Sequence, residues 1–179
     1  MDRFNSKDDL LNSRLNHTFY QRDALTIAPE ILGKTLVRAW PDGTRICLPI
    51  SEVEVYLGTH DRACNASKGK TERNQIMFAN GGVIYMYLVY GMHWMFNIVT
   101  GTVDQPEALL IRGIGNIYGP GRVTRHLQLD KHFYGEDLAT SEMIWLEEAP
   151  PVKRYSTGPR VGINYAGEPW VSMPWRYKI

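Results

Sequence analysis

The sequence predicts an α+β fold: a single compact domain with a mainly antiparallel sheet, a protruding β-hairpin and a few flanking helices. Two observations indicate this class. Short apolar segments of strand length are separated by turn residues, while two segments have the spacing of a helix face. The 179 residues are 44% hydrophobic and 22% charged, as in an ordinary globular domain. We expect this domain over residues 16–179 and a mobile tail over residues 1–15.

The elements are predicted in order along the chain. A helix is expected over Asp23–Gly33, because Asp23 can cap its first turn and Gly33 can end its last, although Pro29 lies inside it. Pro41-Asp42-Gly43 predicts a turn between two strands. The remaining expectations are strands over 35–40, 50–57, 83–90, 93–100, 108–114 and 175–179, an irregular segment over 60–75 and a helix over 122–129.

One long uncharged stretch has to be distinguished from a membrane span. From Asn74 to Val103 there is no Asp, Glu, Lys or Arg, and a membrane span needs about 20 largely apolar residues. Asn80-Gly81-Gly82 interrupts the stretch early, and the longest strictly apolar run is Val83–Tyr90, which has the length of a strand. We therefore expect a buried hairpin and no association with a membrane.

Charge and cysteine content exclude several classes of protein. The formal net charge is +1, from 20 basic and 19 acidic residues, which excludes a histone-like protein and an acidic solvating tail. Two cysteines, Cys47 and Cys64, are too few for a disulfide framework and indicate reduced thiols in the cytosol. The first 14 residues are polar and of mixed sign, so we do not expect secretion.

The strand over 52–57 carries a candidate catalytic carboxylate. Because side chains alternate along a strand, Glu52, Glu54 and Tyr56 share the face opposite Val53 and Val55. A carboxylate beside an aromatic ring can act as a general base or stabilise developing positive charge. The pattern is equally that of an ordinary solvated strand face, so both interpretations stay open.

The predicted hairpin carries tyrosines of two kinds. Tyr85 and Tyr87 share one face of their strand, and core strands commonly use tyrosine. Tyr90 lies at the turn with Gly91 and Met92, where a bulky ring has little core to enter. Exposed aromatic side chains on a rigid projection are suited to stacking on bases or wedging between them.

The basic residues of the sequence also have two interpretations, as structural ion pairs or as contacts to an anionic ligand. Arg112 lies in an apolar strand, so it either pairs with a carboxylate such as Glu52 or binds an anion such as phosphate. Gly119-Pro-Gly-Arg122 before a helix could bind a phosphate as well. The last 29 residues add a surplus of four positive charges that could follow a nucleic-acid backbone: Lys153, Arg154, Arg160, Arg176 and Lys178, against Glu168.

Other chemistries lack their motifs. No Cys or His spacing resembles a zinc site, and there is no phosphate-binding Gly-Lys-Ser/Thr loop and no Gly-x-Ser-x-Gly turn. We expect no metal and no cofactor.

Taken together and in order, these segments resemble the alkyladenine (3-methyladenine) DNA glycosylase family, of the methylpurine type. The resemblance extends from Phe19 to Ile179. Its most specific parts are Glu52-Val-Glu-Val-Tyr-Leu-Gly58, Lys70-Thr-Glu-Arg-Asn74 with Met77-Phe78, Tyr85-Met-Tyr-Leu-Val-Tyr-Gly-Met92 with Asn97, Leu110-Ile-Arg112, Gly119-Pro-Gly121 and Arg160-Val-Gly-Ile-Asn-Tyr-Ala-Gly-Glu168.

The resemblance implies a monofunctional enzyme that flips a damaged purine out of duplex DNA and hydrolyses its N-glycosidic bond. It implies that Glu54 activates the water, with Arg112 as its companion and the backbone carbonyl of Val161 holding the same water. It further implies base contacts from Tyr56, Tyr87 and Asn97, a wedge at Tyr90 beside Met92, and DNA contacts from Lys70, Thr71, Met77 and Arg122.

One position departs from the family pattern. Asn65 stands where better-known members carry a histidine that contacts the base, and an amide lacks the charge and stacking surface of an imidazole. The range of lesions is therefore open: 3-methyladenine, 7-methylguanine, hypoxanthine or ethenoadenine.

The expected partner is double-stranded DNA with damaged purines, bound by a monomer in the cytoplasm, at the nucleoid of a prokaryote or in the nucleus of a eukaryote. Two other functions remain as alternatives. One is a binder of distorted DNA without catalysis, and the other is a hydrolase of free nucleosides, which would not need Tyr90.

Overall fold

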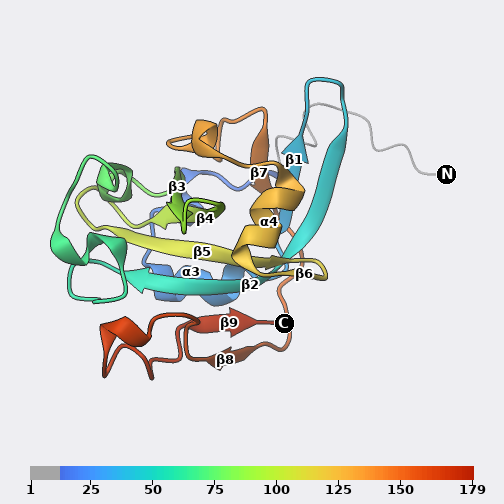
Figure 1. Ribbon diagram of the computed structural model, residues 1–179. Helices are drawn as coiled ribbons and strands as arrows, with labels where there is room; N and C mark the ends of the chain where they lie inside the picture. Colours follow the sequence, from blue (N-terminus) through green and yellow to red (C-terminus); the bar gives the residue numbers. More distant parts are fainter. Residues whose placement is uncertain (1–12) are drawn as a thin grey trace.

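The computed structural model describes residues 13–179, which form one curled antiparallel sheet covered by short helices (Figure 1). The predicted α+β class is confirmed. The described helices are α2 (His17–Tyr20), α3 (Ala24–Ile31) and α4 (Pro120–Leu127). The described strands are β1 (Thr35–Ala39), β2 (Arg45–Leu57), β3 (Ile84–Val89), β4 (His93–Thr100), β5 (Glu107–Ile114), β6 (Ile117–Tyr118), β7 (Ile144–Glu147), β8 (Ser156–Gly158) and β9 (Arg176–Lys178).

The strands pair in the order β3-β4-β5-β2-β1-β7, and β9 joins β2 to β8. The 13-residue strand β2 organises this arrangement because its first part pairs with β1 and its second part with both β5 and β9. In Figure 1, α3 lies behind β2, α4 lies in front of the sheet, and β8 and β9 run along the lower edge. Residues from β2, β5 and β9 are therefore neighbours although they are far apart in the sequence.

The main core lies between α3 and the sheet. Asp23 caps α3 by accepting a bond of 2.9 Å from the amide of Thr26, as the sequence predicts. The apolar side of the helix, with Ile27 and Ile31, packs against the strands, including Val53 and Val55 of β2. With these valines fixed in the core, the opposite face of β2 is directed toward the other side of the sheet.

The predicted strand over 93–100 coincides with β4, and the other predicted strands agree with the observed ones to within a few residues. The sequence reading did not assign β7, a four-residue strand that pairs with β1. Of the expected tail, residues 1–12 lie outside the described residues. Arg14 forms a bridge with Glu147 and Leu15 is buried, so residues 13–15 belong to the domain and not to the tail.

The β3–β4 hairpin projects from the sheet and is seen nearly end-on in Figure 1. Its turn closes through a bond from the amide of Met92 to the carbonyl of Val89. Tyr90 and Gly91 both have positive φ, +52° and +68°, as in the tight turns that match strand twist. A non-glycine residue in this conformation is uncommon, and here it holds the Tyr90 ring away from the domain.

Candidate active site

Glu54 is fully buried on β2, with 0% of its side chain exposed. Its Oε1 accepts a bond of 2.7 Å from the amide of Val161, and its Oε2 accepts one of 2.8 Å from the hydroxyl of Tyr56. Arg112 Nε lies 3.4 Å from Oε1. Glu52 on the same face is also buried, so the interpretation of this face as a solvated surface is wrong.

Burial controls the protonation of Glu54. Loss of water raises the pKa of this carboxyl above its ordinary value. The nearby Arg112 guanidinium, the Val161 amide, the Tyr56 hydroxyl and Arg160 act in the opposite direction. A carboxylate with a raised pKa is a better proton acceptor than an ordinary one, provided that it is ionised.

A local irregularity brings Arg112 to this carboxylate. The pairing of β2 with β5 shifts register on either side of Glu52, which pairs with Gly113 while Val53 pairs with Ile111. Such bulges change the direction of a side chain, and Arg112 lies at this one. A Cβ on Gly113 would lie 2.7 Å from Ser51 Oγ and 3.0 Å from Glu52 Cβ, so the close approach depends on glycine.

Both interpretations of Arg112 find support. Its Nε lies 3.3 Å from Glu52 Oε1, so it pairs with a carboxylate as one alternative states. It also lines the main cleft of the molecule, where an anionic ligand could reach it. The guanidinium is thus a structural partner and a part of the cleft wall.

A buried ion pair holds the Val161 segment against β2. Arg160 donates bonds of 2.6 and 2.9 Å to the two oxygens of Asp61 and a further bond to the Val55 carbonyl. Its guanidinium also lies over the ring of Tyr56, at 4.8 Å from the centroid. Arg160 is therefore unavailable to a nucleic-acid backbone, which corrects the prediction that counted it among exposed basic residues.

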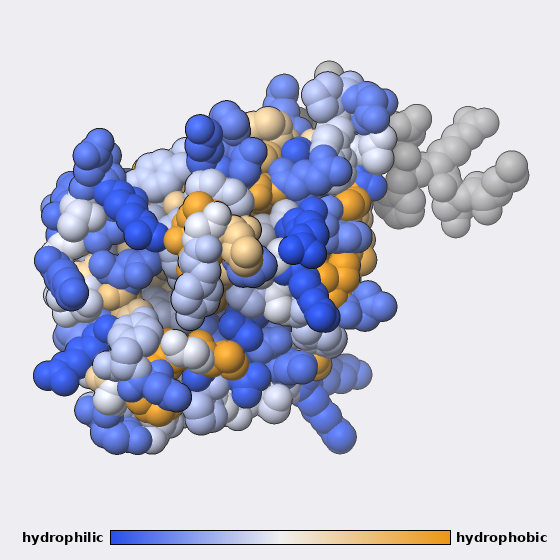
Figure 2. All heavy atoms as spheres, in the orientation of Figure 1, coloured by the Kyte–Doolittle hydropathy of each residue, from blue (hydrophilic) through white to orange (hydrophobic). Residues whose placement is uncertain are grey.

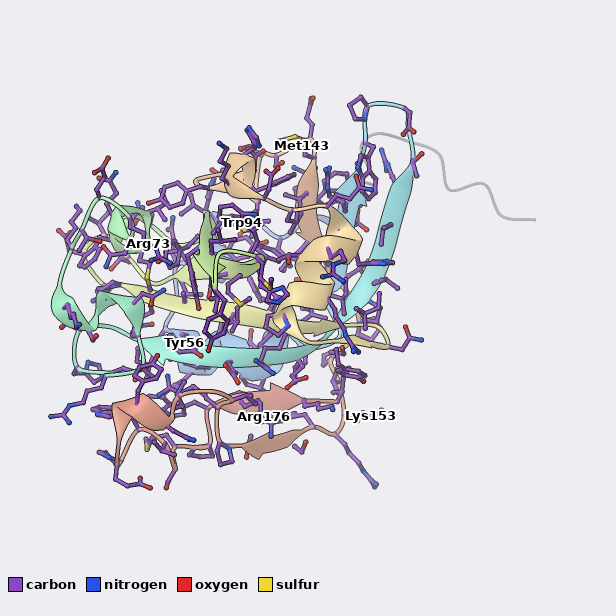
Figure 3. All side chains as sticks on the ribbon, viewed as in Figure 1. Tyr56, Arg73, Trp94, Met143, Lys153 and Arg176 are labelled. Carbon is purple, nitrogen blue, oxygen red and sulfur yellow. The ribbon has the colours of Figure 1, made fainter. Side chains whose placement is uncertain are left out.

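The cleft above Glu54 has a volume of about 860 Å³. Its lining includes Tyr56, Asn65, Tyr87, Tyr90, Arg112, Arg122 and Val161. Figure 3 shows Tyr56 near the end of β2, close to the segment that carries Arg73. The structure thus brings together most residues that the resemblance singled out, from five different parts of the chain.

Tyr56 and Tyr87 give the cleft two aromatic walls. Both side chains are largely removed from water, and burial raises the pKa of each hydroxyl, so both remain neutral. Tyr85 and Tyr87 contact each other with ring centroids 5.3 Å apart. Asn97 is buried below them and donates to the carbonyls of Tyr85 and Met95.

Asn65 lies at the rim of the same cleft. Its amide Nδ2 donates a bond of 3.1 Å to the hydroxyl of Tyr85, while its backbone carbonyl accepts one from Asn74. Burial raises the pKa of Tyr85 to about 12, so this hydroxyl stays neutral. The side chain that departs from the family pattern is therefore held in a defined position beside the aromatic walls.

The predicted DNA-contacting residues divide into two groups. Tyr90 is 91% exposed and Met92 68% exposed at the hairpin tip, and Lys70 and Arg122 are also exposed. Thr71 is exposed at the start of a turn closed by Asn74. Figure 2 shows that this face of the molecule is largely hydrophilic, with small apolar patches.

Met77 differs from these residues. It is 2% exposed and packs in a small cluster with Cys64 and Tyr85. The thioether is not presented at the surface, so the structure does not support a groove contact by this side chain. Its segment has the apolar spacing of a short helix and forms the 3₁₀ turn Gln75–Phe78, which directs the thioether inward.

Sequence reasoning did not predict the roles of three residues at the site. Asp61 and Arg160 form the ion pair that places Val161, and Arg73 lies over the outer face of Tyr87 at 5.7 Å from its centroid. The Arg73 guanidinium also donates to the Leu88 carbonyl. A signal for Asp61 was its place just after Gly58 at the end of β2, but no pattern in the sequence connects it to Arg160.

Residues 13–179 lack two kinds of feature. No group of three or more His, Cys, Asp or Glu side chains could hold a metal ion there. Among the helices of that range, none has the length and apolar content needed to cross a membrane.

Comparison with known proteins gives the class and the family. The model of the methylpurine-DNA glycosylase family matches residues 18–118 and 115–179. Proteins named "Putative 3-methyladenine DNA glycosylase" from Methanocella arvoryzae and Anaeromyxobacter dehalogenans strain 2CP-C are 38% and 41% identical to this chain. The alignments cover 91% and 93% of the chain and 90% and 83% of the relatives. The fold and cleft are thus those of a DNA glycosylase. The chain belongs to the methylpurine-DNA glycosylase family.

Proposed function

We propose that the protein is a monofunctional DNA glycosylase of base-excision repair. It flips an alkylated or deaminated purine out of duplex DNA and hydrolyses the N-glycosidic bond, which leaves an abasic site. The observation that carries the proposal is the buried carboxylate of Glu54, held by three residues that line an aromatic cleft: Val161, Tyr56 and Arg112.

Glu54 has two tasks in this reaction. Breaking the bond between sugar and base builds positive charge on the sugar, and a nearby buried carboxylate stabilises that charge more in the transition state than in the ground state. The same carboxylate accepts a proton from the attacking water. Val161 is half-exposed in the cleft next to Glu54, so its carbonyl can help to hold the water.

Tyr56 and Tyr87 select the base. Two neutral rings that line one cleft can hold a flat purine between them, and an alkylated purine with a positive charge gains cation–π attraction. Flipping costs a few kcal/mol and is cheapest at a damaged or mismatched pair. Cationic lesions such as 3-methyladenine and 7-methylguanine leave readily, whereas hypoxanthine and ethenoadenine require protonation of the leaving base.

Tyr90 and Met92 occupy the gap that the flipped nucleotide leaves, because they stand exposed at the hairpin tip beside the cleft. Lys70, Thr71 and Arg122 are exposed and contact the DNA backbone. The described lining of the cleft contains arginines but no lysine, so a Schiff base that would cut the strand has no candidate amine. The enzyme acts as a monomer, because this chain itself supplies the aromatic rings, the arginines and the hairpin tip of the cleft.

Release of bases from four duplexes tests the proposal, with 3-methyladenine, 7-methylguanine, hypoxanthine or ethenoadenine as the single lesion. We expect release of at least one of them and a loss of about 10³-fold in rate for Glu54→Gln with DNA binding retained. Glu107→Gln is the matched control, because Glu107 is a half-buried carboxyl of β5 that caps α3 outside the cleft. Undiminished excision by Glu54→Gln, or no release by the unaltered protein, would contradict the proposal.

A further inference from the structure

A second buried carboxylate, Glu52, shares Arg112 with the catalytic one. It is 4% exposed, and its Oε1 lies 3.3 Å from Arg112 Nε and 3.3 Å from Arg176 Nη1. Arg112 Nε in turn lies 3.4 Å from Glu54 Oε1. Four charges of alternating sign therefore run from β9 through β2 to β5, in the order Arg176, Glu52, Arg112 and Glu54. Figure 3 labels Arg176 on β9, below the strand that carries Tyr56.

The guanidinium of Arg112 is used in an unusual way. An arginine has five N–H donors and usually pairs with a carboxylate through two parallel bonds. Here one nitrogen, Nε, faces both Glu52 and Glu54, and the terminal nitrogens have no partner among residues 13–179. The side chain is 14% exposed and lines the cleft. The free donors of Arg112 are therefore left at the wall where a flipped nucleotide would lie.

Glu52 explains why Arg112 does not form the two-bond pairing with Glu54. A single carboxylate beside an arginine is free to bind its fork, as Asp61 does with Arg160 in the same molecule. Two carboxylates on one face of β2 compete for Arg112, and the bulge at Glu52 brings both to the same nitrogen. Arg176 fixes Glu52 from the other side, at 3.3 Å.

We infer that Glu52 is a positioning residue that holds Arg112 by Nε, prevents it from saturating Glu54, and so keeps Glu54 reactive and the terminal nitrogens of Arg112 free for the substrate. This inference rests on the proposed function, because it assigns Glu52 a task in the same reaction. It goes further, because it attributes the state of Glu54 to a second carboxylate that shares Arg112 with it.

The inference predicts a shift in pH dependence. The charged and titratable groups that face Glu54 are Tyr56 on β2, Tyr87 on β3, Arg112 on β5, and Arg160 and Tyr165 of the segment after β8. Glu52 lies on the other side of the shared Arg112 Nε. In Glu52→Gln a like charge is removed and Arg112 is released toward Glu54, and both changes favour the ionised form of Glu54. The pKa of Glu54 falls, so the acidic limb of the rate profile moves to lower pH.

The experiment is single-turnover release of 7-methylguanine from methylated duplex DNA between about pH 5 and pH 9, with a blank without enzyme at each pH. This lesion is cationic, so the acidic limb contains no step that protonates the leaving base. We expect the limb of Glu52→Gln to lie on the order of one pH unit below that of the unaltered protein, with a lower plateau. Glu107→Gln serves as the control and should leave the limb in place.

A second variant, Arg176→Met, should shift the acidic limb of the rate profile in the opposite direction. It leaves Glu52 without its second arginine, so Glu54 faces more uncompensated negative charge and the limb moves to higher pH. The shift should be smaller than for Glu52→Gln, because the Arg176 side chain is 32% exposed and water screens its charge. Opposite shifts in the two variants support the inference, since general damage to the fold would not give opposite signs.

The outcomes separate the two proposals. If the unaltered protein releases no base, the proposed function fails. If it releases 7-methylguanine and the limbs of Glu52→Gln and Arg176→Met coincide with its own, Glu52 has no positioning role and the inference is overturned. Thermal unfolding of each variant identifies one that does not fold, and the other variant then decides the matter.

Discussion

The molecule contains two buried pairs of a carboxylate and an arginine that differ in how completely they are bonded. Asp61 and Arg160 have fully buried side chains, share two bonds of 2.6 and 2.9 Å, and Asp61 accepts two more from the amides of Leu57 and Ala63. Glu54 is as deeply buried, yet its nearest contact to Arg112 is 3.4 Å through a nitrogen shared with Glu52.

The difference separates structure from chemistry. Asp61 shares two short bonds with a single guanidinium and accepts two more from backbone amides, so this pair joins the Val161 segment to β2. Glu54 is compensated only in part, and burial raises its pKa. A carboxylate in that state can accept a proton from water or respond to charge on a substrate. Incomplete pairing of a buried charge is thus what distinguishes the candidate catalytic residue from its neighbour.

The largest expected effect comes from breaking the complete pair. Asp61→Asn removes the charge that compensates Arg160, which is 4% exposed, and an uncompensated buried charge costs about 3–5 kcal/mol. Urea unfolding should show a loss of this size. Asp104→Asn, at an exposed position, should change the free energy of unfolding by less than about 0.5 kcal/mol. Equal stability of Asp61→Asn and the unaltered protein would remove the distinction between the pairs.

A change in the pair of Glu54 with Arg112 should lower the rate of base release. Arg112→Lys keeps the positive charge but replaces a planar fork with a point charge, which cannot face Glu52 and Glu54 and still offer free donors to the cleft. We expect the single-turnover rate of base release to fall about 10²-fold. Circular dichroism should show a folded protein. A rate within about twofold of the unaltered enzyme would mean that the charge of Arg112 suffices.

These pairs also mark the limit of prediction from sequence. Alternation along β2 predicted that Glu52, Glu54 and Tyr56 share a face, and turn signals predicted most strands, because both depend on neighbours in the sequence. Burial of that face was not predictable, since Arg176 and the segment around Val161 contact it from more than 100 residues away.

Other parts of the site were out of reach for the same reason. The contact of Arg112 with two carboxylates depends on a bulge, and the buried pair of Asp61 with Arg160 joins residues 99 positions apart. Neither has a local pattern. The inward position of Met77 likewise follows from packing against Tyr85, and the outward position of Tyr90 follows from the turn that the sequence did indicate.

Tyr90 at the hairpin tip differs from both pairs, because its side chain is exposed instead of buried. Tyr90 is 91% exposed, so Tyr90→Ala should leave stability unchanged. Stacking of a ring on a base contributes about 1–3 kcal/mol, so release from duplex DNA should fall about 10-fold. Release from a single-stranded substrate should change little, because no gap needs to be filled. Tyr155→Ala, at an exposed ring that packs on Tyr177, is the control, and an equal loss in both variants would exclude a wedge.

The smallest effect concerns stability and has an unusual sign. Because burial raises the pKa of Glu54 in the folded state, the unfolded state holds the ionised form better, and Glu54 opposes folding once pH exceeds its ordinary value near 4. Glu54→Gln should therefore stabilise the protein at pH 8 by on the order of 1 kcal/mol, or about 2–4 °C in Tm. The gain should shrink as pH falls and vanish below about pH 4, where Glu54 is protonated in both the folded and the unfolded state. Calorimetry over this range measures it, and a loss of stability at pH 8 would mean that Arg112, Val161 and Tyr56 fully offset the burial of the charge.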